Sequence, residues 1–320
     1  MRARLKSILS NKNSRQGLWL LPLIFALTGV LWLSISTEQF ASSQNMTNLL
    51  AQAMPLIIVA IGQMLVILLG GLDLSVGAVI SFTTAILALD ASGAVLIPLV
   101  FVAAATIGLI NGFVVTRLNV NPIIATLAVQ MIVMGITRMM RPVAGGHVPD
   151  IVIWAVSADV FGIPLTIVWG LVVALIAWKI LYGSRFGLHL FAIGGGVAAG
   201  REDAAHTFGL SDKRTILLSY VACSCFAALA GIFLAGRIVS GDPNVGPPFA
   251  LDSITAVAIG GTQLSGGIGS LHGTVIGAVV MALLSNGMNL ANLSAFVQTV
   301  IKGSILLAVV AFQSRKKMGL

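Results

Sequence analysis

From residue 18 to residue 312, the sequence consists of long apolar runs separated by short polar joints. An apolar run of about 20 residues is long enough to cross the hydrocarbon core of a bilayer as a helix. Only 9% of the 320 residues are charged and 58% are hydrophobic, whereas a soluble domain carries about 25% charged residues. The chain is therefore predicted to be an all-α, polytopic membrane protein with one transmembrane domain over residues 1–320.

The apolar runs predict about ten transmembrane helices. The first is predicted to be a retained helix and not a signal peptide, because its run is of spanning length and no small-residue cleavage site follows it. The predicted spans are 18–35, 48–69, 74–90, 94–116, 123–140, 163–182, 215–236, 251–264, 270–288 and 294–312. Between spans, the predicted loops include 141–162, 237–250 and the long polar segment 183–214.

The placement of the basic residues predicts the orientation of the chain. With ten spans and a cytoplasmic N-terminus, the tails 1–17 and 313–320 both lie inside. The inner side then holds all 18 bases except Arg138, Arg141, Arg237 and Lys302. This asymmetry follows the positive-inside rule. The net charge of +8 therefore indicates membrane topology and contact with anionic lipid, and it does not indicate nucleic-acid binding.

One stretch between two spans, residues 70–77, reads Gly-Gly-Leu-Asp-Leu-Ser-Val-Gly. A carboxylate beside hydrocarbon costs about 3 kcal/mol on insertion scales, so Asp73 is a functional candidate. The alternative is that Asp73 is merely solvated in a short aqueous turn. The frame Gly-Gly-x-x-Leu-Ser-x-Gly returns at 260–267, where Gln263 replaces the aspartate. The shared glycines predict a pair of tight turns near the inner mouth of the protein.

Most polar residues within the predicted spans are uncharged, as Gln63 and Asn111 illustrate. Amides and hydroxyls can bind a neutral, hydroxyl-rich solute, or they can join helices at about 0.6 kcal/mol each. An ion-coupled transporter should show charges deep within its helices, whereas Asp252 and Lys302 are expected near helix ends. The residues predicted to line a solute pathway are Asp73, Ser75, Asn121, Thr126, Gln263, Asn286 and Asn289.

The sequence contains little that indicates catalysis. It has no H-E-x-x-H or G-x-S-x-G motif and no G-x-x-x-x-G-K-[ST] phosphate loop, so a metalloprotease site, an α/β-hydrolase site and P-loop ATP binding are not expected. The side chains of Cys223 and Cys225 point to different faces of one helix, which makes a disulfide or metal site between them improbable. No enzymatic activity, metal or cofactor is predicted.

The segment 183–214 is much longer than the roughly 2–8 residues that usually join two helices. It has mixed charge and contains Phe186, Phe191 and Phe208. We expect it to dock on another protein. The alternative is a solvated loop with a surface helix.

Together these motifs resemble those of the inner-membrane permease subunits of ribose-type bacterial ABC sugar importers. Beyond residues 70–77, the resemblance rests on Asn-Pro-Ile-Ile-Ala-Thr-Leu at 121–127, Ser-Arg-Phe-Gly at 184–187, Ala-Ile-Gly-Gly at 192–195, Ala-Leu-Ala-Gly at 228–231, Ile-Gly-Gly-Thr at 259–262 and Asn-Gly-Met-Asn-Leu at 286–290. It extends over almost the whole chain.

The resemblance implies that a cytoplasmic Glu-Ala-Ala-x-x-x-Gly element docks on the ATPase subunit. The residues that match this element are Glu202, Asp203, Ala204, Ala205 and Gly209. Asp203 stands where the family has glutamate, and about five extra residues precede the element, so its start is left open.

The resemblance further implies alternating access in the bacterial inner membrane, driven by separate ATPase subunits. A periplasmic binding protein would deliver the solute to the loops near 141–162 and 237–250, and a second permease chain, identical or related, would complete the transporter. The alternatives from other classes are a stand-alone secondary transporter of a polar solute and a membrane scaffold without transport. The sequence does not distinguish among sugars, polyols and sugar-like signalling molecules.

Overall fold

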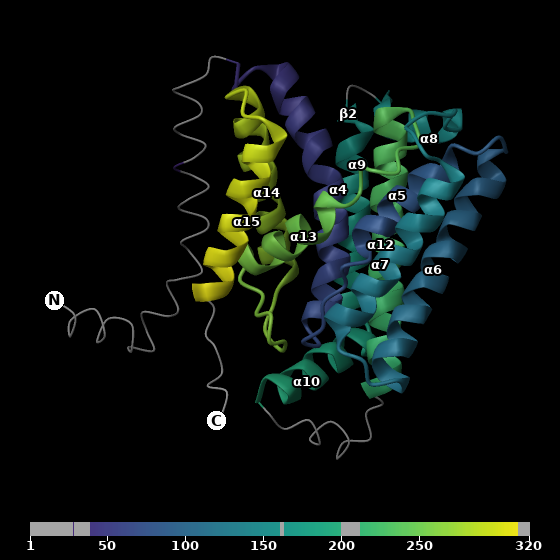
Figure 1. Cartoon of the computed structure of the whole chain (residues 1–320). Helices are drawn as coiled ribbons and strands as arrows, with labels where there is room; N and C mark the ends of the chain where they lie inside the picture. Colours follow the sequence, from purple (N-terminus) through teal and green to yellow (C-terminus); the bar gives the residue numbers. More distant parts are fainter. Residues whose placement is uncertain (1–27, 29–38, 161–162, 200–211, 313–320) are drawn as a thin grey trace.

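The computed structural model describes residues 28, 39–160, 163–199 and 212–312, and these contain eleven helices and one short hairpin (Figure 1). The helices are α4 (Ser43–Ile67), α5 (Val76–Leu87), α6 (Gly93–Arg117), α7 (Pro122–Met140), α8 (Asp150–Ser157), α9 (Leu165–Tyr182), α10 (Arg185–Ala199), α12 (Asp212–Ile238), α13 (Pro248–Ile259), α14 (Leu271–Leu290) and α15 (Ala295–Phe312). Strands β1 (Asp159–Val160) and β2 (Ile163–Pro164) pair antiparallel. Apart from this hairpin, the described chain is helical, as predicted.

Six of the described helices, α4, α6, α7, α9, α12 and α14, are long and apolar enough to cross a membrane. Helices α5 and α13 and most of α15 are apolar but shorter. The prediction of a polytopic membrane protein is therefore confirmed. The count of ten spans stays a prediction, because the first predicted span, 18–35, lies outside the described residues except for residue 28.

The predicted loop 141–162 is wrong in one respect, because it contains helix α8. The buried residues of this short helix, Val152 and Val156, are one turn apart and face α12 at Gly236. A Cβ at Gly236 would lie 2.7 Å from the carbonyl oxygen of Val152. Tertiary packing against Gly236 of α12 therefore stabilises α8. The sequence did not predict this helix, because the residues around it are turn formers.

Two predicted spans end earlier than expected. The span predicted at 74–90 is the 12-residue helix α5, and the span predicted at 251–264 is the 12-residue helix α13. Gly261, just after α13, has a φ of +83°. A residue with a positive φ cannot continue a right-handed helix, so α13 ends at Ile259 with Gly260 as its C-cap, and the rest of the glycine frame at 260–267 forms a turn.

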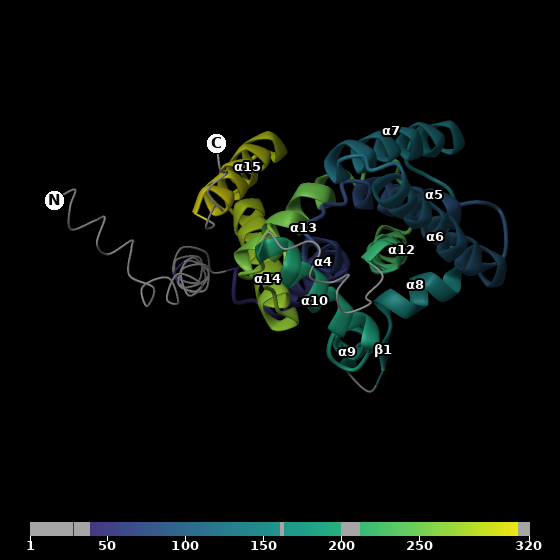
Figure 2. The same ribbon diagram turned by 90° about the horizontal axis from the view of Figure 1, so that it is seen from below.

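Helix α12 lies at the centre of the larger group of helices, where it packs against α4, α5 and α6 (Figures 1 and 2). Close approach depends on glycine. A Cβ at Gly108 on α6 would lie 2.6 Å from the Cα of Val221, and one at Gly112 would lie 2.8 Å from the Cα of Leu217. The numbering runs in opposite directions, so α6 and α12 are antiparallel. Glycine-mediated backbone contact is a common way to join helices in lipid.

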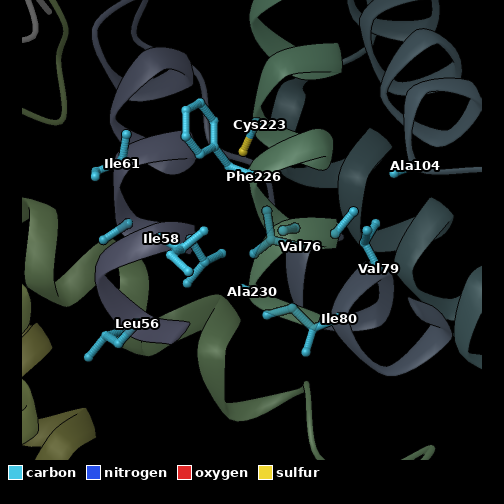
Figure 3. Packing of buried hydrophobic residues seen from close by; sticks show 14 of the residues in the cluster. Leu56, Ile58, Ile61, Val76, Val79, Ile80, Ala104, Cys223, Phe226 and Ala230 are labelled. Carbon is cyan, nitrogen blue, oxygen red and sulfur yellow. The ribbon is translucent and has the colours of Figure 1, made fainter. Parts of the chain in front are cut away.

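The core is filled by aliphatic side chains of α4 and α5, among them Ile58, Ile61 and Ile80 (Figure 3). Phe226 of α12 packs within the same cluster and is 4% exposed.

A second group is formed by α13, α14 and α15. Helices α13 and α14 form an antiparallel pair in which Gly260 meets Gly273, α14 also packs on α4, and α15 packs on α13 (Figure 2). Helix α10 lies across one end of the bundle, and α8 with the hairpin lies at the other (Figure 1). These are called the α10 end and the α8 end below.

Candidate functional site

The site is built around the turn that links α4 to α5, at residues 68–75. Gly70 has a φ of +75°, a conformation that costs glycine little and other residues more. The chain reverses here, so Asp73 and Ser75 are brought against α6, α7 and α12. Both side chains are completely buried.

The carboxyl group of Asp73 is held on one oxygen. Its Oδ1 accepts hydrogen bonds from the backbone N–H of Ser75 at 2.9 Å and from the Ser75 hydroxyl at 2.6 Å. The Nδ2 of Asn111, on α6, donates to the Ser75 Oγ at 2.8 Å and lies 3.4 Å from Asp73 Oδ1. Asp73, Ser75 and Asn111 therefore form one buried network, and the alternative of a solvated Asp73 is wrong.

Two further side chains bind the backbone of the same turn. With its amide oriented to satisfy both partners, Gln63 on α4 donates to the Asp73 carbonyl at 3.0 Å and accepts from the Asp73 N–H at 3.1 Å. Thr126 on α7 accepts a hydrogen bond from the Leu74 N–H at 3.1 Å. Side chains of α4 and α7 thus replace helical hydrogen bonds that the backbone of the turn lacks, as a turn buried in a membrane protein requires.

Three polar atoms in this region have no hydrogen-bond partner in the described structure. They are Asp73 Oδ2, Asn111 Oδ1 and Tyr220 Oη. The described residues also place no basic side chain within ion-pair distance of Asp73, since their ion pairs are His147–Asp150 and Lys302–Asp252. A buried carboxylate without a cation is costly. Asp73 is such a group, which is unusual for a residue that serves only to shape a turn.

No metal site accounts for Asp73. Across residues 28, 39–160, 163–199 and 212–312, there is no group of three or more His, Cys, Asp or Glu side chains placed to hold a metal ion. Cys223 is buried and Cys225 half-buried, and both are free thiols.

The seven predicted pathway residues do not form one cluster. Asp73, Ser75 and Thr126 come together at the turn. Asn121 is exposed and caps α7 by accepting a hydrogen bond from the Ile123 N–H at 2.9 Å. Gln263 is half-buried in the second glycine turn.

Asn286 and Asn289 lie near the α8 end of α14. Asn286 exchanges two amide hydrogen bonds with Asn45 of α4, at 2.9 and 3.1 Å, and both side chains are buried. Asn289 is exposed and accepts a hydrogen bond from Gln298 of α15 at 2.8 Å. The Asn286 pair matches the role of amides that join helices.

Two residues of these networks had little signal in the sequence. Asn45 lies just before an apolar run, where it resembles an ordinary loop residue. Tyr220 is one of only two tyrosines in the chain. The only sequence signal for its place in the site was a hydroxyl group within an apolar run.

The two glycine frames touch each other. The N–H of Gly267 donates to the carbonyl of Leu68 at 2.9 Å, and a Cβ at Gly266 would lie 2.9 Å from the backbone nitrogen of Gly70. Helix α10 joins the same place, because a Cβ at Gly194 would collide with the Leu68 carbonyl oxygen and would lie 2.9 Å from the nitrogen of Gly267. We call residues 68–70, 194 and 266–267 the glycine joint.

The predicted coupling residues Glu202, Asp203, Ala204, Ala205 and Gly209 lie outside the described residues. Most of the described part of the 183–214 segment is helix α10, whose Phe191 ring stacks on Tyr182 of α9 with centroids 6.3 Å apart, and residues 212–214 begin α12. The segment is thus helical up to Ala199.

The comparisons with known proteins agree with this architecture. Residues 45–310 match the family model described as the branched-chain amino acid transport system / permease component. The chain is 33% identical over 305 residues to a ribose import permease protein of Escherichia coli K12, which covers 92% of this chain and 93% of the relative.

Two other relatives extend the comparison. A ribose import permease protein of Bacillus subtilis is 35% identical over 90% of each chain. A D-allose transport system permease protein of Escherichia coli K12 is 31% identical, over 92% of this chain and 89% of the relative. No solved structure matches the chain significantly. The buried turns, the apolar spanning helices and the match over residues 45–310 together show that the chain belongs to the family of branched-chain amino acid transport system permease components.

Proposed function

We propose that the chain is the permease subunit of an ATP-binding cassette importer and forms the path of a sugar or sugar-like solute across the bacterial inner membrane. The observation that carries this proposal is the near full-length similarity to permeases named for ribose and allose. ATP is hydrolysed by a partner chain, and a periplasmic binding protein supplies the solute. The chain itself needs no cofactor.

The distribution of charge supports a cytoplasmic α10 end. Described bases at this end are Arg117, Lys179, Arg185, Lys213 and Arg214, against the single acid Asp212. The α8 end holds Arg138, Arg141 and Arg237 against Asp90, Asp150, Asp159 and Asp242. By the positive-inside rule, the α10 end faces the cytoplasm. Ten spans with both termini inside, in a single domain over 1–320, are consistent with this orientation.

The glycine joint supports the role of residues 183–214 in coupling. Helix α10 opens this segment, and its Gly194 contacts the backbones of both glycine turns. A displacement of α10 is therefore transmitted to α4 and α13 without an intervening side chain. We propose that Glu202, Asp203, Ala204, Ala205 and Gly209 dock on the ATPase and that α10 relays its movement.

For the pathway we propose two roles among the seven predicted residues. The buried Asp73, Ser75, Thr126 and Asn286 set the shape of the helices beside the path. Asn121, Gln263 and Asn289 reach the surface and can meet the solute.

Membrane lipid and a second permease chain, identical or related, are the remaining proposed partners. One cavity of about 330 Å³ between α5, α6 and α7 is lined by aliphatic and Phe82 side chains with Thr106 as its polar member. Such a lining suits a lipid chain and not a hydroxyl-rich solute. The polar path is therefore expected at a surface that the second permease chain completes.

A stand-alone secondary transporter is the second candidate, favoured by the unpaired Asp73 carboxyl group, since intramembrane carboxylates often carry coupling ions. The test is sugar uptake into proteoliposomes that hold the chain with its genomically adjacent ATPase and binding protein. ATP-dependent uptake of ribose, allose or galactose supports the importer. Uptake that follows a proton or sodium gradient, without ATPase, would replace it with the second candidate.

A variant at the coupling element sharpens this test. Asp203→Arg should abolish ATP-driven uptake while the chain still reaches the membrane. Uptake at the wild-type rate would show that the coupling element lies elsewhere.

A further inference from the structure

The segment between α12 and α13, residues 239–247, is not helical although it lies beside a membrane helix. It follows α5 along its length, because Gly241 packs against Ala88 at one end of α5 and Gly246 packs against Gly77 at the other. Irregular backbone at membrane depth is tolerated only where it is buried in protein or lines a water-filled space.

Hydroxyl groups of α5 satisfy the backbone of this segment on its inner side. Thr84 Oγ1 accepts from the Asp242 N–H at 3.1 Å. Its one hydroxyl proton faces both the Ser81 carbonyl at 2.9 Å and the Asp242 carbonyl at 3.1 Å. Ser81 Oγ accepts from the Gly246 N–H at 2.9 Å. The segment is therefore anchored to α5 as a series of turns, and its other side is directed away from α5.

Helix α13 begins where this segment ends. Its 12 residues extend about 18 Å, which is too short for a hydrocarbon core of about 30 Å. Because Pro247 lies beside Gly77, the first residue of α13 is at the depth of the first turn of α5. The N-terminus of α13 thus lies well inside the bundle and not at its surface end.

Polar side chains follow the outward side of this path. Asn244 is exposed and accepts a hydrogen bond from Arg138 Nη2 at 3.3 Å, and its N–H donates to Asp242 Oδ1 at 2.8 Å. Further along, Asp252 of α13 pairs with Lys302 of α15 at 2.7 Å. We call Arg138, Asp242, Asn244, Asp252 and Lys302 the polar strip.

The polar strip contrasts with the other outward faces. The exposed residues of α9, for example, include Leu171, Val172 and Leu175, as a helix facing lipid requires. Charged groups at membrane depth almost always face a water-filled space or the interior of a helix bundle. Helices α7 and α15, which carry Arg138 and Lys302, lie on either side of α13 (Figures 1 and 2).

We propose that the polar strip borders a water-filled path and that Asp242, Asn244 and Arg138 form the solute-binding contact at its α8 end. Carboxylate and amide oxygens accept hydrogen bonds from sugar hydroxyls, and the guanidinium group and the Asn244 amide donate to sugar oxygens. The Asp252–Lys302 pair forms the next polar step toward the α10 end. This inference rests on the proposed function, and it assigns the solute contact to residues outside the Asp73 network.

The test uses single cysteine variants in the assembled transporter. Asn244→Cys should react with a charged, membrane-impermeant thiol reagent at least tenfold faster than Leu175→Cys, the lipid-facing control, and ribose, allose or galactose delivered by the binding protein should slow that reaction. The unsubstituted chain, with Cys223 buried and Cys225 half-buried, measures background labelling. In transport, Asn244→Ala should weaken apparent affinity by about fivefold, the loss expected for one hydrogen bond.

The outcomes separate this inference from the proposed function. If the wild-type protein transports a sugar but Asn244→Cys reacts no faster than Leu175→Cys, the polar strip does not border water and the inference fails alone. Spontaneous disulfide-linked dimers of Asn244→Cys without aqueous labelling would assign this surface to contact between two copies and also overturn it. Rapid labelling without any effect of sugar would show a water path that lacks the proposed binding contact.

Discussion

Gly267 donates its backbone N–H to the carbonyl of Leu68 at 2.9 Å, so the two glycine frames, nearly 200 positions apart in the sequence, form one joint. Gly194 of α10 closes the joint from the α10 end. Three segments that the chain order separates are therefore in direct backbone contact. This arrangement makes the joint a direct backbone contact between α10 and the turn that carries Asp73.

Adding a methyl group to the joint should damage the protein. Gly194→Ala places a Cβ against the Leu68 carbonyl oxygen, and overpacking of this kind costs about 1–3 kcal/mol. We expect lower thermal stability in detergent and loss of ATP-driven uptake. The matched control is Gly195→Ala on the same helix, where the added Cβ has no atom within 4 Å. If Gly194→Ala and Gly195→Ala showed the same thermal stability and the same ATP-driven uptake, the glycine joint would not be part of the coupling between α10 and the other helices.

The Asp73 network should tolerate an amide better than a methyl group. Asp73→Asn keeps an acceptor for the Ser75 N–H and hydroxyl, whereas Asp73→Ala leaves these buried donors unpaired at about 1–3 kcal/mol. We expect a clear fall in the unfolding midpoint for Asp73→Ala and a small change for Asp73→Asn. Uptake by Asp73→Asn then tests function separately: wild-type uptake would restrict Asp73 to holding the turn.

The Asn45–Asn286 pair should contribute stability and little else. A double-mutant cycle with Asn45→Ala and Asn286→Ala should give a coupling free energy near 0.6 kcal/mol, the average for interhelical hydrogen bonds in membrane proteins. Unfolding by denaturant in detergent measures it. A loss of uptake in Asn286→Ala that exceeds its loss of folded protein would instead favour a solute contact.

Replacing one member of the Asp252–Lys302 ion pair should lower the amount of folded protein, and exchanging the two charges should restore part of it. Removing one partner of a buried ion pair costs about 3–5 kcal/mol because the other charge is left uncompensated. These side chains are 14% and 21% exposed and belong to the polar strip proposed to border water, which compensates part of the remaining charge, so we expect the lower part of that range. Lys302→Met should reduce the amount of folded protein in membranes, and Asp252→Lys with Lys302→Asp should recover part of it. Full expression of Lys302→Met would show that water already compensates Asp252.

The local sequence predicted those helices whose formation depends on the apolar character of consecutive residues. Apolar run length identified the long helices α4, α6, α7, α9, α12 and α14, because each must be apolar over its whole length to lie in hydrocarbon. Helix α8 was missed, since its stability depends on the contact of Val152 with Gly236, which no local pattern reveals.

The candidate site was predicted only in part. Asp73, Ser75 and Thr126 were found because polar groups are exceptional in apolar surroundings, and the structure brings them together. Tyr220 was not predicted as a site residue. Its hydroxyl group, which has no hydrogen-bond partner among the described residues, belongs to the site only because the fold places it beside Gly71 in the turn. The exposed contact between Arg138 and Asn244 joins an α7 residue to a loop more than 100 positions away.

The sequence alone determined that this chain is a polytopic membrane protein, because hydrocarbon imposes composition and length on every segment that crosses it. It also determined that residues 70–77 and 260–267 are turns, since their glycines adopt conformations that other residues avoid. Only the tertiary structure decided that these turns meet each other and α10, and that Asp73 lies in a completely buried network. Those features depend on contacts between distant segments, where the position of one backbone sets the space left for another.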